Sequence, residues 1–242
     1  MEDIINAIQS AVISLDKEAT KNHKEKLNFD SVNIHTGRSS PLSSFFEKEL
    51  SKELSQVFPN YHIHIDYPLR LLNYKKEKLK KDGVKRSQAI YPDIMIVKLN
   101  KDKKTRLLKA IIEIKLDLGH LDLKSDRIKQ KENLLKKASY GIFNTIVGAY
   151  SKLEQNKNRI INVTIPKSLK KNFIVVTKSN QHKHKGKLKS KSFLNKMEKY
   201  GYKVIFILDE NIHFNTLENN QKAIKKRVKL LESEIKSAFS GI

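Results

Sequence analysis

Two acidic residues and a lysine stand beside or within two apolar runs in the stretch YPDIMIVKLNKDKKTRLLKAIIEIKL, residues 91–116. Asp93 precedes the first run, while Glu113 and Lys115 lie inside the second. The polar segment 101–104 predicts a turn between them, and therefore an antiparallel hairpin. A turn centred near residue 103 pairs residues whose numbers sum to about 206, which sets Asp93 opposite Glu113 with Cβ atoms about 5 Å apart.

The same hairpin predicts which side chains share a face. Glu113 and Lys115 are two residues apart and emerge on one face, whereas Ile112, Ile114 and Leu116 point into the core. Two carboxylates that close repel each other unless a cation lies between them. Hard oxygen ligands favour Mg²⁺, for which Mn²⁺ is an expected substitute, and the carbonyl of Ile114 is a further candidate ligand. A metal ion there would polarise a phosphate and acidify a bound water.

These residues carry a resemblance to a known family. Pro92 and Asp93, followed after a turn by Glu113-Ile114-Lys115, resemble the motif of the PD-(D/E)xK nuclease superfamily, which includes type II restriction endonucleases and Holliday-junction resolvases. The resemblance implies a mixed sheet flanked by helices, Mg²⁺-dependent hydrolysis of phosphodiester bonds, metal binding by Asp93 and Glu113, and a catalytic role for Lys115. It extends over roughly residues 43–150.

Many members of that superfamily add a glutamate from the helix before the first core strand. The segment FFEKELSKEL is similar to the E-x-x-L pattern of the resolvase helix and offers Glu47, with Glu53 second and Glu49 third. The resemblance therefore implies Glu47 as a further metal-binding and catalytic residue. A solvated helix face is the alternative for these glutamates.

Hydrophobic periodicity indicates how the chain positions these residues. It predicts helices over 2–16, from Ser43 or Ser44 to Phe58, over 125–150 with a break at Gly141 as an alternative, and over 192–200, and a basic helix over 218–239. Strands are predicted at 61–69, in the two runs of the hairpin, at 172–178 and at 202–210, with loops at 17–41, 73–88 and 181–191. We therefore expect one α/β domain, 1–242, with a central mixed sheet of about five strands. A restriction-endonuclease-like core would span about 43–210, with 2–16 and 218–239 as additions.

Charge predicts the partner. The 242 residues carry 49 Lys and Arg against 26 Asp and Glu, a net charge of +23, which attracts polyanions. A biased codon supply explains many lysines but not the shortage of acids. The predicted double-stranded DNA contacts lie in two basic segments, and the last helix adds Lys225, Lys226 and Arg227. The two segments contribute Lys81, Lys85, Arg86, Gln88, Lys183, Lys185, Lys187, Lys189 and Lys191.

Other patterns limit the function further. There is no cysteine, no apolar run long enough to span a bilayer and no phosphate-binding GxxxxGK[ST] motif, so we expect a cytoplasmic protein without membrane or nucleotide cofactor. By analogy with symmetric duplex sites we expect a homodimer. His62 and His64 could bind zinc, but a partly exposed strand face is the expected explanation. A site-specific type II restriction endonuclease is the leading hypothesis; a structure-specific nuclease and a non-catalytic basic nucleic-acid-binding protein remain the alternatives.

Overall fold

The computed structural model describes most of the chain in two compact units. The first unit comprises Met1–Pro59, Glu113–Leu123 and Lys171–Ile242, and the second comprises Asn60–Ile112 and Lys124–Lys170. The described residues are 2–30, 40–66, 69–71, 89–99, 105–116, 127–139, 145–149, 159–177, 183–208 and 220–242.

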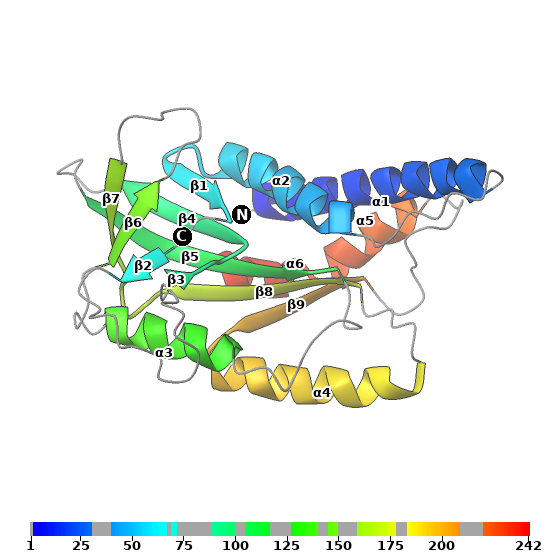
Figure 1. Cartoon of the computed structure of the whole chain (residues 1–242). Helices are drawn as coiled ribbons and strands as arrows, with labels where there is room; N and C mark the ends of the chain where they lie inside the picture. Colours follow the sequence, from blue (N-terminus) through cyan, green and yellow to red (C-terminus); the bar gives the residue numbers. More distant parts are fainter. Residues whose placement is uncertain are drawn as a thin grey trace. The chain divides into compact units, whose positions relative to one another are not determined.

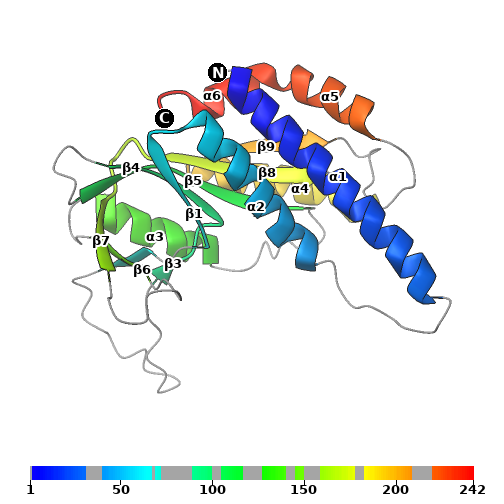
Figure 2. The same ribbon diagram turned by 90° about the horizontal axis from the view of Figure 1, so that it is seen from above.

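The first unit is mainly helical. Its elements are α1 (Glu2–Asp30), α2 (Ser40–Val57), β8 (Lys170–Thr177), α4 (Lys183–Lys199), β9 (Lys203–Leu208), α5 (Gln221–Leu230) and α6 (Glu232–Phe239). The parallel pair β8–β9 carries α4 on one face and α5 with α6 on the other (Figure 1). On α1 and α2 the buried apolar residues recur at helical spacing, with Ile4, Ile8 and Val12 on α1 and Phe46 and Leu50 on α2, and the two helices pack along these stripes (Figure 2).

The second unit contains most of the strands. Its elements are β1 (Tyr61–Ile65), β2 (Leu69–Leu71), β3 (Ala89–Ile90), β4 (Ile94–Leu99), β5 (Thr105–Lys115), α3 (Arg127–Ser139), β6 (Thr145–Ala149) and β7 (Arg159–Thr164). Strand β5 begins in this unit, and its last three residues belong to the first.

Nine strands of the described residues form one sheet in the order β1-β4-β5-β7-β6-β2-β3, with β8 pairing β5 and β9 pairing β8. β4 runs antiparallel to β5, whereas β7 runs parallel to it, so the sheet is mixed. The α/β fold with a mixed sheet flanked by helices is thus confirmed, with more strands than the five expected. Of the additional strands, β2 and β3 have only three and two residues, whereas β6 and β7 have five and six.

Several predicted elements are wrong in extent or type. The helix expected over 2–16 continues to Asp30, into a segment predicted as loop. The helix expected over 125–150 ends at Ser139, and Thr145–Ala149 forms strand β6, which pairs with β7 and β2. Strand β7 was not predicted. The pairing of β-branched residues with neighbouring strands explains β6, because such residues pack well in a sheet and lose rotamer freedom in a helix.

Two basic segments also differ from their prediction. The segment 181–191 was predicted as a loop, but α4 begins at Lys183, since lysine is a good helix former and only Gly186 opposes the helix. The expected helix over 218–239 is divided at Leu231 into α5 and α6. The predicted loop 73–88 and turn 101–104 lie outside the described residues. Within the described part of the chain, no helix is long and apolar enough to cross a bilayer.

Candidate functional site

The β4–β5 ladder has the predicted register where it approaches the motif. Ile94 pairs with Ile112, Met95 with Ile111 and Ile96 with Ala110, so each pair of residue numbers sums to 206. The register shifts by one between Ile96 and Val97, where a β-bulge interrupts the ladder. The antiparallel hairpin and its register near the motif are therefore confirmed.

Asp93 lies half-buried immediately before β4, in the second unit. The backbone N–H of Asp66, a residue with the unusual φ of 51°, donates a hydrogen bond to the carbonyl oxygen of Asp93 at 3.0 Å. From α3, the Nζ of Lys131 donates to the carbonyl oxygen of Tyr91 at 3.0 Å. The end of β1 and helix α3 thus both hold the backbone of the segment that carries the aspartate.

Glu113, Ile114 and Lys115 form the end of β5, in the first unit. Ile112 and Ile114 are fully buried, as predicted, whereas Leu116 is only half-buried. The carbonyl oxygen of Leu116 accepts a hydrogen bond from the N–H of Thr177 at 2.9 Å, which ties the strand end to β8. Glu113 is only 7% exposed, and Lys115 is half-buried. A carboxylate this far from water needs a polar partner or a cation to offset its desolvation.

Helix α2 distinguishes the three candidate glutamates. Glu47 is 7% exposed and accepts a hydrogen bond from Ser43 Oγ at 3.0 Å. Glu53 accepts one from Ser10 Oγ on α1 at 2.9 Å, so its carboxylate takes part in helix packing. Glu49 is half-buried. Glu47 therefore combines the deepest burial with a place in the same unit as Glu113.

The predicted DNA contacts fall into two groups. Lys81, Lys85, Arg86 and Gln88 lie outside the described residues. Lys183, Lys185, Lys187 and Lys189 lie in α4, and Lys191 on the same helix is exposed. The prediction of a loop is wrong for the second group, which lies on a regular helix.

Glu132 on α3 is a buried acid that the sequence reasoning missed. It is only 1% exposed, in the second unit. Its neighbours in the sequence, KQKENLLKK, are mostly polar or charged. The signal was nevertheless present, because Glu132 lies three residues before the buried Leu135 and so shares its helix face.

The donor chemistry suits a hard cation with few protein ligands. No group of three or more His, Cys, Asp or Glu side chains that could hold a metal ion occurs among the described residues. Mg²⁺ needs no such cage, since it keeps several waters and commonly uses one or two carboxylates together with substrate phosphates. The buried carboxylates Glu47 and Glu113 and the half-buried Asp93 therefore fit Mg²⁺ in donor type, without a closed site.

The histidine pair of β1 does not favour zinc. The rings of His62 and His64 lie 6.3 Å apart, and Arg106 Nη1 is 3.3 Å from His64 Nε2. A guanidinium can only donate, so His64 Nε2 accepts and its imidazole is neutral. Burial first, then the charges of Arg106 and His62, lowers the pKa of His64 to about 4. The hydrogen bond from Arg106 therefore occupies the lone pair of His64 Nε2 that would otherwise bind a zinc ion.

In comparisons with known proteins, no family model, curated protein or solved structure matched this chain. Hypotheses about its function therefore depend on its residues and their geometry.

Proposed function

We propose that this protein is a Mg²⁺-dependent endonuclease that hydrolyses phosphodiester bonds of double-stranded DNA, in the manner of a type II restriction endonuclease. The observation that carries the proposal is the register of the β4–β5 ladder, in which Ile94 pairs with Ile112. Asp93 directly precedes Ile94, and Glu113 directly follows Ile112. The two acids of the motif are thus the next residues on the two strands.

Two carboxylates, those of Asp93 and Glu113, would hold the metal with the carbonyl of Ile114 as a further oxygen. Glu47 would act beside them without completing a group of three ligands. When bound, Mg²⁺ would polarise the scissile phosphate and lower the pKa of a bound water. Lys115 would orient that water or stabilise charge developing on the phosphate. The low exposure of Glu47 and Glu113 supports these roles, because fixed carboxylates lose little freedom when they bind a metal.

The net charge of +23 supports nucleic acid as the substrate, since it promotes encounter with a polyanion. A homodimer is part of the proposal, because symmetric duplex sites are cut by symmetric pairs. A second candidate is a basic nucleic-acid-binding protein without catalysis. The observation that favours it is that the described residues include no group of three or more potential metal ligands.

The test is cleavage of long linear duplex DNA with and without Mg²⁺, with wild type beside Asp93→Ala and Lys115→Ala. Discrete fragments that require Mg²⁺ and vanish in both variants support a site-specific nuclease. A metal-dependent smear that the variants lose keeps the chemistry but contradicts site specificity. Absence of cutting on linear and on branched DNA with any divalent metal contradicts the enzyme and favours the binding protein.

A further inference from the structure

Helix α5 presents four lysines on one face. Lys222, Lys225, Lys226 and Lys229 follow the helical spacing i, i+3, i+4 and i+7, and all four are exposed. We call them the α5 lysine face. The opposite side carries Ile224 and Val228, both fully buried, where α5 packs on α1 and β9. At a rise of about 1.5 Å per residue, the face extends for about 10 Å.

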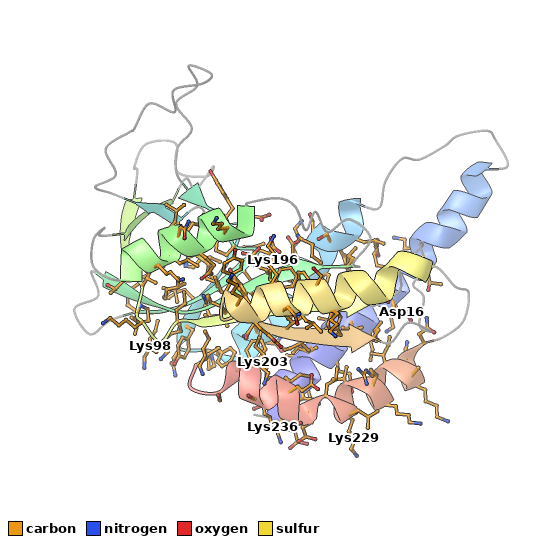
Figure 3. The ribbon with its side chains drawn as sticks, turned by 90° about the horizontal axis from the view of Figure 1, so that it is seen from below. Asp16, Lys98, Lys196, Lys203, Lys229 and Lys236 are labelled. Carbon is orange, nitrogen blue, oxygen red and sulfur yellow. The ribbon has the colours of Figure 1, made fainter. Side chains whose placement is uncertain are left out.

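The positive charge of this face is not neutralised by the helix that carries it. α5 contains no acidic residue, and among the described residues neither Lys222, Lys225 nor Lys226 has a hydrogen-bond or ion-pair partner. The nearest acid along the chain is Glu232, at the start of α6. Its carboxylate accepts a hydrogen bond from Nζ of Lys236 on the same helix. The hydrogen bond and charge of Lys236 lower the pKa of Glu232, with a smaller contribution from Lys229. Figure 3 shows Lys229 and Lys236 projecting outward from these helices.

An open hollow adjoins the lysine face within the first unit. It has a volume of about 500 Å³, and Ile5, Asn6 and Gln9 of α1 line it together with Lys225, Lys226 and Lys229. Glu2 and Glu232 also border it. Two side-chain amides and three ammonium groups therefore surround one hollow, and both kinds of group donate hydrogen bonds to phosphate oxygens.

The geometry points to the phosphate backbone of nucleic acid as the ligand of this face: we propose that the α5 lysine face and its hollow bind the DNA backbone without reading the base sequence. Lysine acts as a mobile point charge suited to phosphates, and the four lysines of the face lie on flexible side chains that carry no planar fork for reading a base. An acidic protein is a poorer fit, since lysine is depleted from protein interfaces. Insertion into a lipid surface is also a poorer fit, because Ile224 and Val228 of α5 are buried and the exposed Leu230 alone offers little apolar surface to insert.

This inference rests on the proposed function only for the choice of DNA, and it does not require hydrolysis. The test is therefore binding of a fluorescent duplex of about 30 base pairs by the full chain in EDTA, over about 50 to 200 mM salt. The test variant replaces Lys222, Lys225, Lys226 and Lys229 by Gln, which preserves helix propensity. The matched control replaces four exposed lysines on other helices, Lys17, Lys48, Lys52 and Lys199, by Gln, so both variants lose the same net charge.

We expect the α5 variant to bind roughly 10- to 100-fold more weakly near 100 mM salt. The slope of log affinity against log salt should become shallower by about 1.8 to 3.6, because two to four of the lysines contact phosphates and each contact contributes about 0.9. The control variant should stay within about threefold of wild type. Thermal unfolding checks that both variants fold. If the quadruple variant fails to fold, the double variant Lys222→Gln/Lys229→Gln replaces it, with about half the expected change in slope.

Three outcomes would overturn the proposal. Equal losses in the two quadruple variants would show that only net charge matters. Unchanged binding by the α5 variant would place the contacts elsewhere. Binding of wild type to phosphatidylserine vesicles but not to the duplex would identify a lipid surface instead. If DNA binding depends on the α5 lysines but the protein never cuts DNA, only the proposed nuclease activity is contradicted. If the protein cuts DNA but its binding does not depend on the α5 lysines, only this inference is contradicted.

Discussion

The acids at the β4–β5 motif and the lysines of α5 are opposite in charge and in environment. Glu113 is 7% exposed at the end of a strand tied to β8, whereas the four lysines of the α5 face are exposed and extend from a helix surface. A buried carboxylate has a fixed position, which chemistry requires, while an exposed ammonium adapts to an irregular ligand. The difference suggests a division of labour, in which the strand acids act on a phosphate and the helix lysines hold its backbone.

The largest expected effect comes from the buried acid of the strand. Glu113→Gln keeps the shape of the side chain but removes the charge that would bind Mg²⁺. We expect the rate of Mg²⁺-dependent cleavage to fall by about 10²- to 10³-fold, while duplex affinity in EDTA does not weaken. Glu198→Gln, at an exposed position of α4, is the matched control and should cut normally. Equal rates in the two variants would remove Glu113 from the site.

Helix α2 offers a sharper test, since two of its glutamates have different partners. We expect Glu47→Gln to reduce cleavage by about 10- to 100-fold through weaker metal binding. Glu53→Gln should leave cleavage nearly unchanged and lower the free energy of unfolding by about 1 kcal/mol, since it weakens the hydrogen bond from Ser10. Cleavage rates and urea unfolding of the two variants measure both effects. The reverse pattern would transfer the role to Glu53.

The position of α5 depends on a polar contact at its start. Asn220 Nδ2 donates to Oδ1 of Asp16, which is 4% exposed on α1, at 3.0 Å. Asn220→Ala removes this donor from a buried carboxylate, so we expect the free energy of unfolding to fall by about 1 to 2 kcal/mol. Asn195→Ala, at an exposed position of α4, should change it little. Equal destabilisation would show that the contact contributes no more than a surface asparagine.

The smallest expected effect concerns His64, whose pKa is lowered from 6.5 to about 4. Because His64 binds a proton more readily in the unfolded chain than in the folded one, neutral His64 favours the folded state. This contribution to the free energy of unfolding is fully present above pH 6.5 and is lost as the pH falls towards 4. The loss should be about 1 kcal/mol after allowance for solvent screening. His64→Gln should flatten the unfolding free energy over this range while leaving DNA binding intact. If the His64→Gln variant has the same pH profile of unfolding free energy as the wild type, folding does not lower the pKa of His64.

The sequence predicted the parts of the fold that local pattern determines. Apolar runs and a polar turn were enough to predict the β4–β5 hairpin and its register from Ile94 to Ile96, but not the bulge after Ile96, which depends on the neighbouring packing. The strand Thr145–Ala149 was missed because its two partners gave no local signal. Strand β2 is distant in the sequence, and β7 was itself not predicted. Lysine-rich stretches were taken for loops because their charge was given more weight than their helix propensity.

The surroundings of the candidate site residues were predictable only in part. The spacing of Glu113 and Lys115 made them candidates, and Glu47 is the most buried of the three candidate glutamates. The burial of Glu132 was missed because its neighbours are charged. The arrangement of the α5 lysines required the actual helix boundaries. The basic cluster predicted from the sequence joins Lys225 and Lys226 to Arg227, which is half-buried, rather than to Lys222 and Lys229.

The most direct test of the proposed division of labour measures cleavage and binding on the same preparations of Glu113→Gln and of the quadruple α5 lysine variant. Single-turnover cleavage with Mg²⁺ at saturating duplex is compared with duplex affinity in EDTA. The account predicts that Glu113→Gln binds but does not cut, while the lysine variant binds weakly yet cuts at nearly the wild-type rate once saturated. Loss of both activities in both folded variants, or cutting by Glu113→Gln at the wild-type rate, would contradict it.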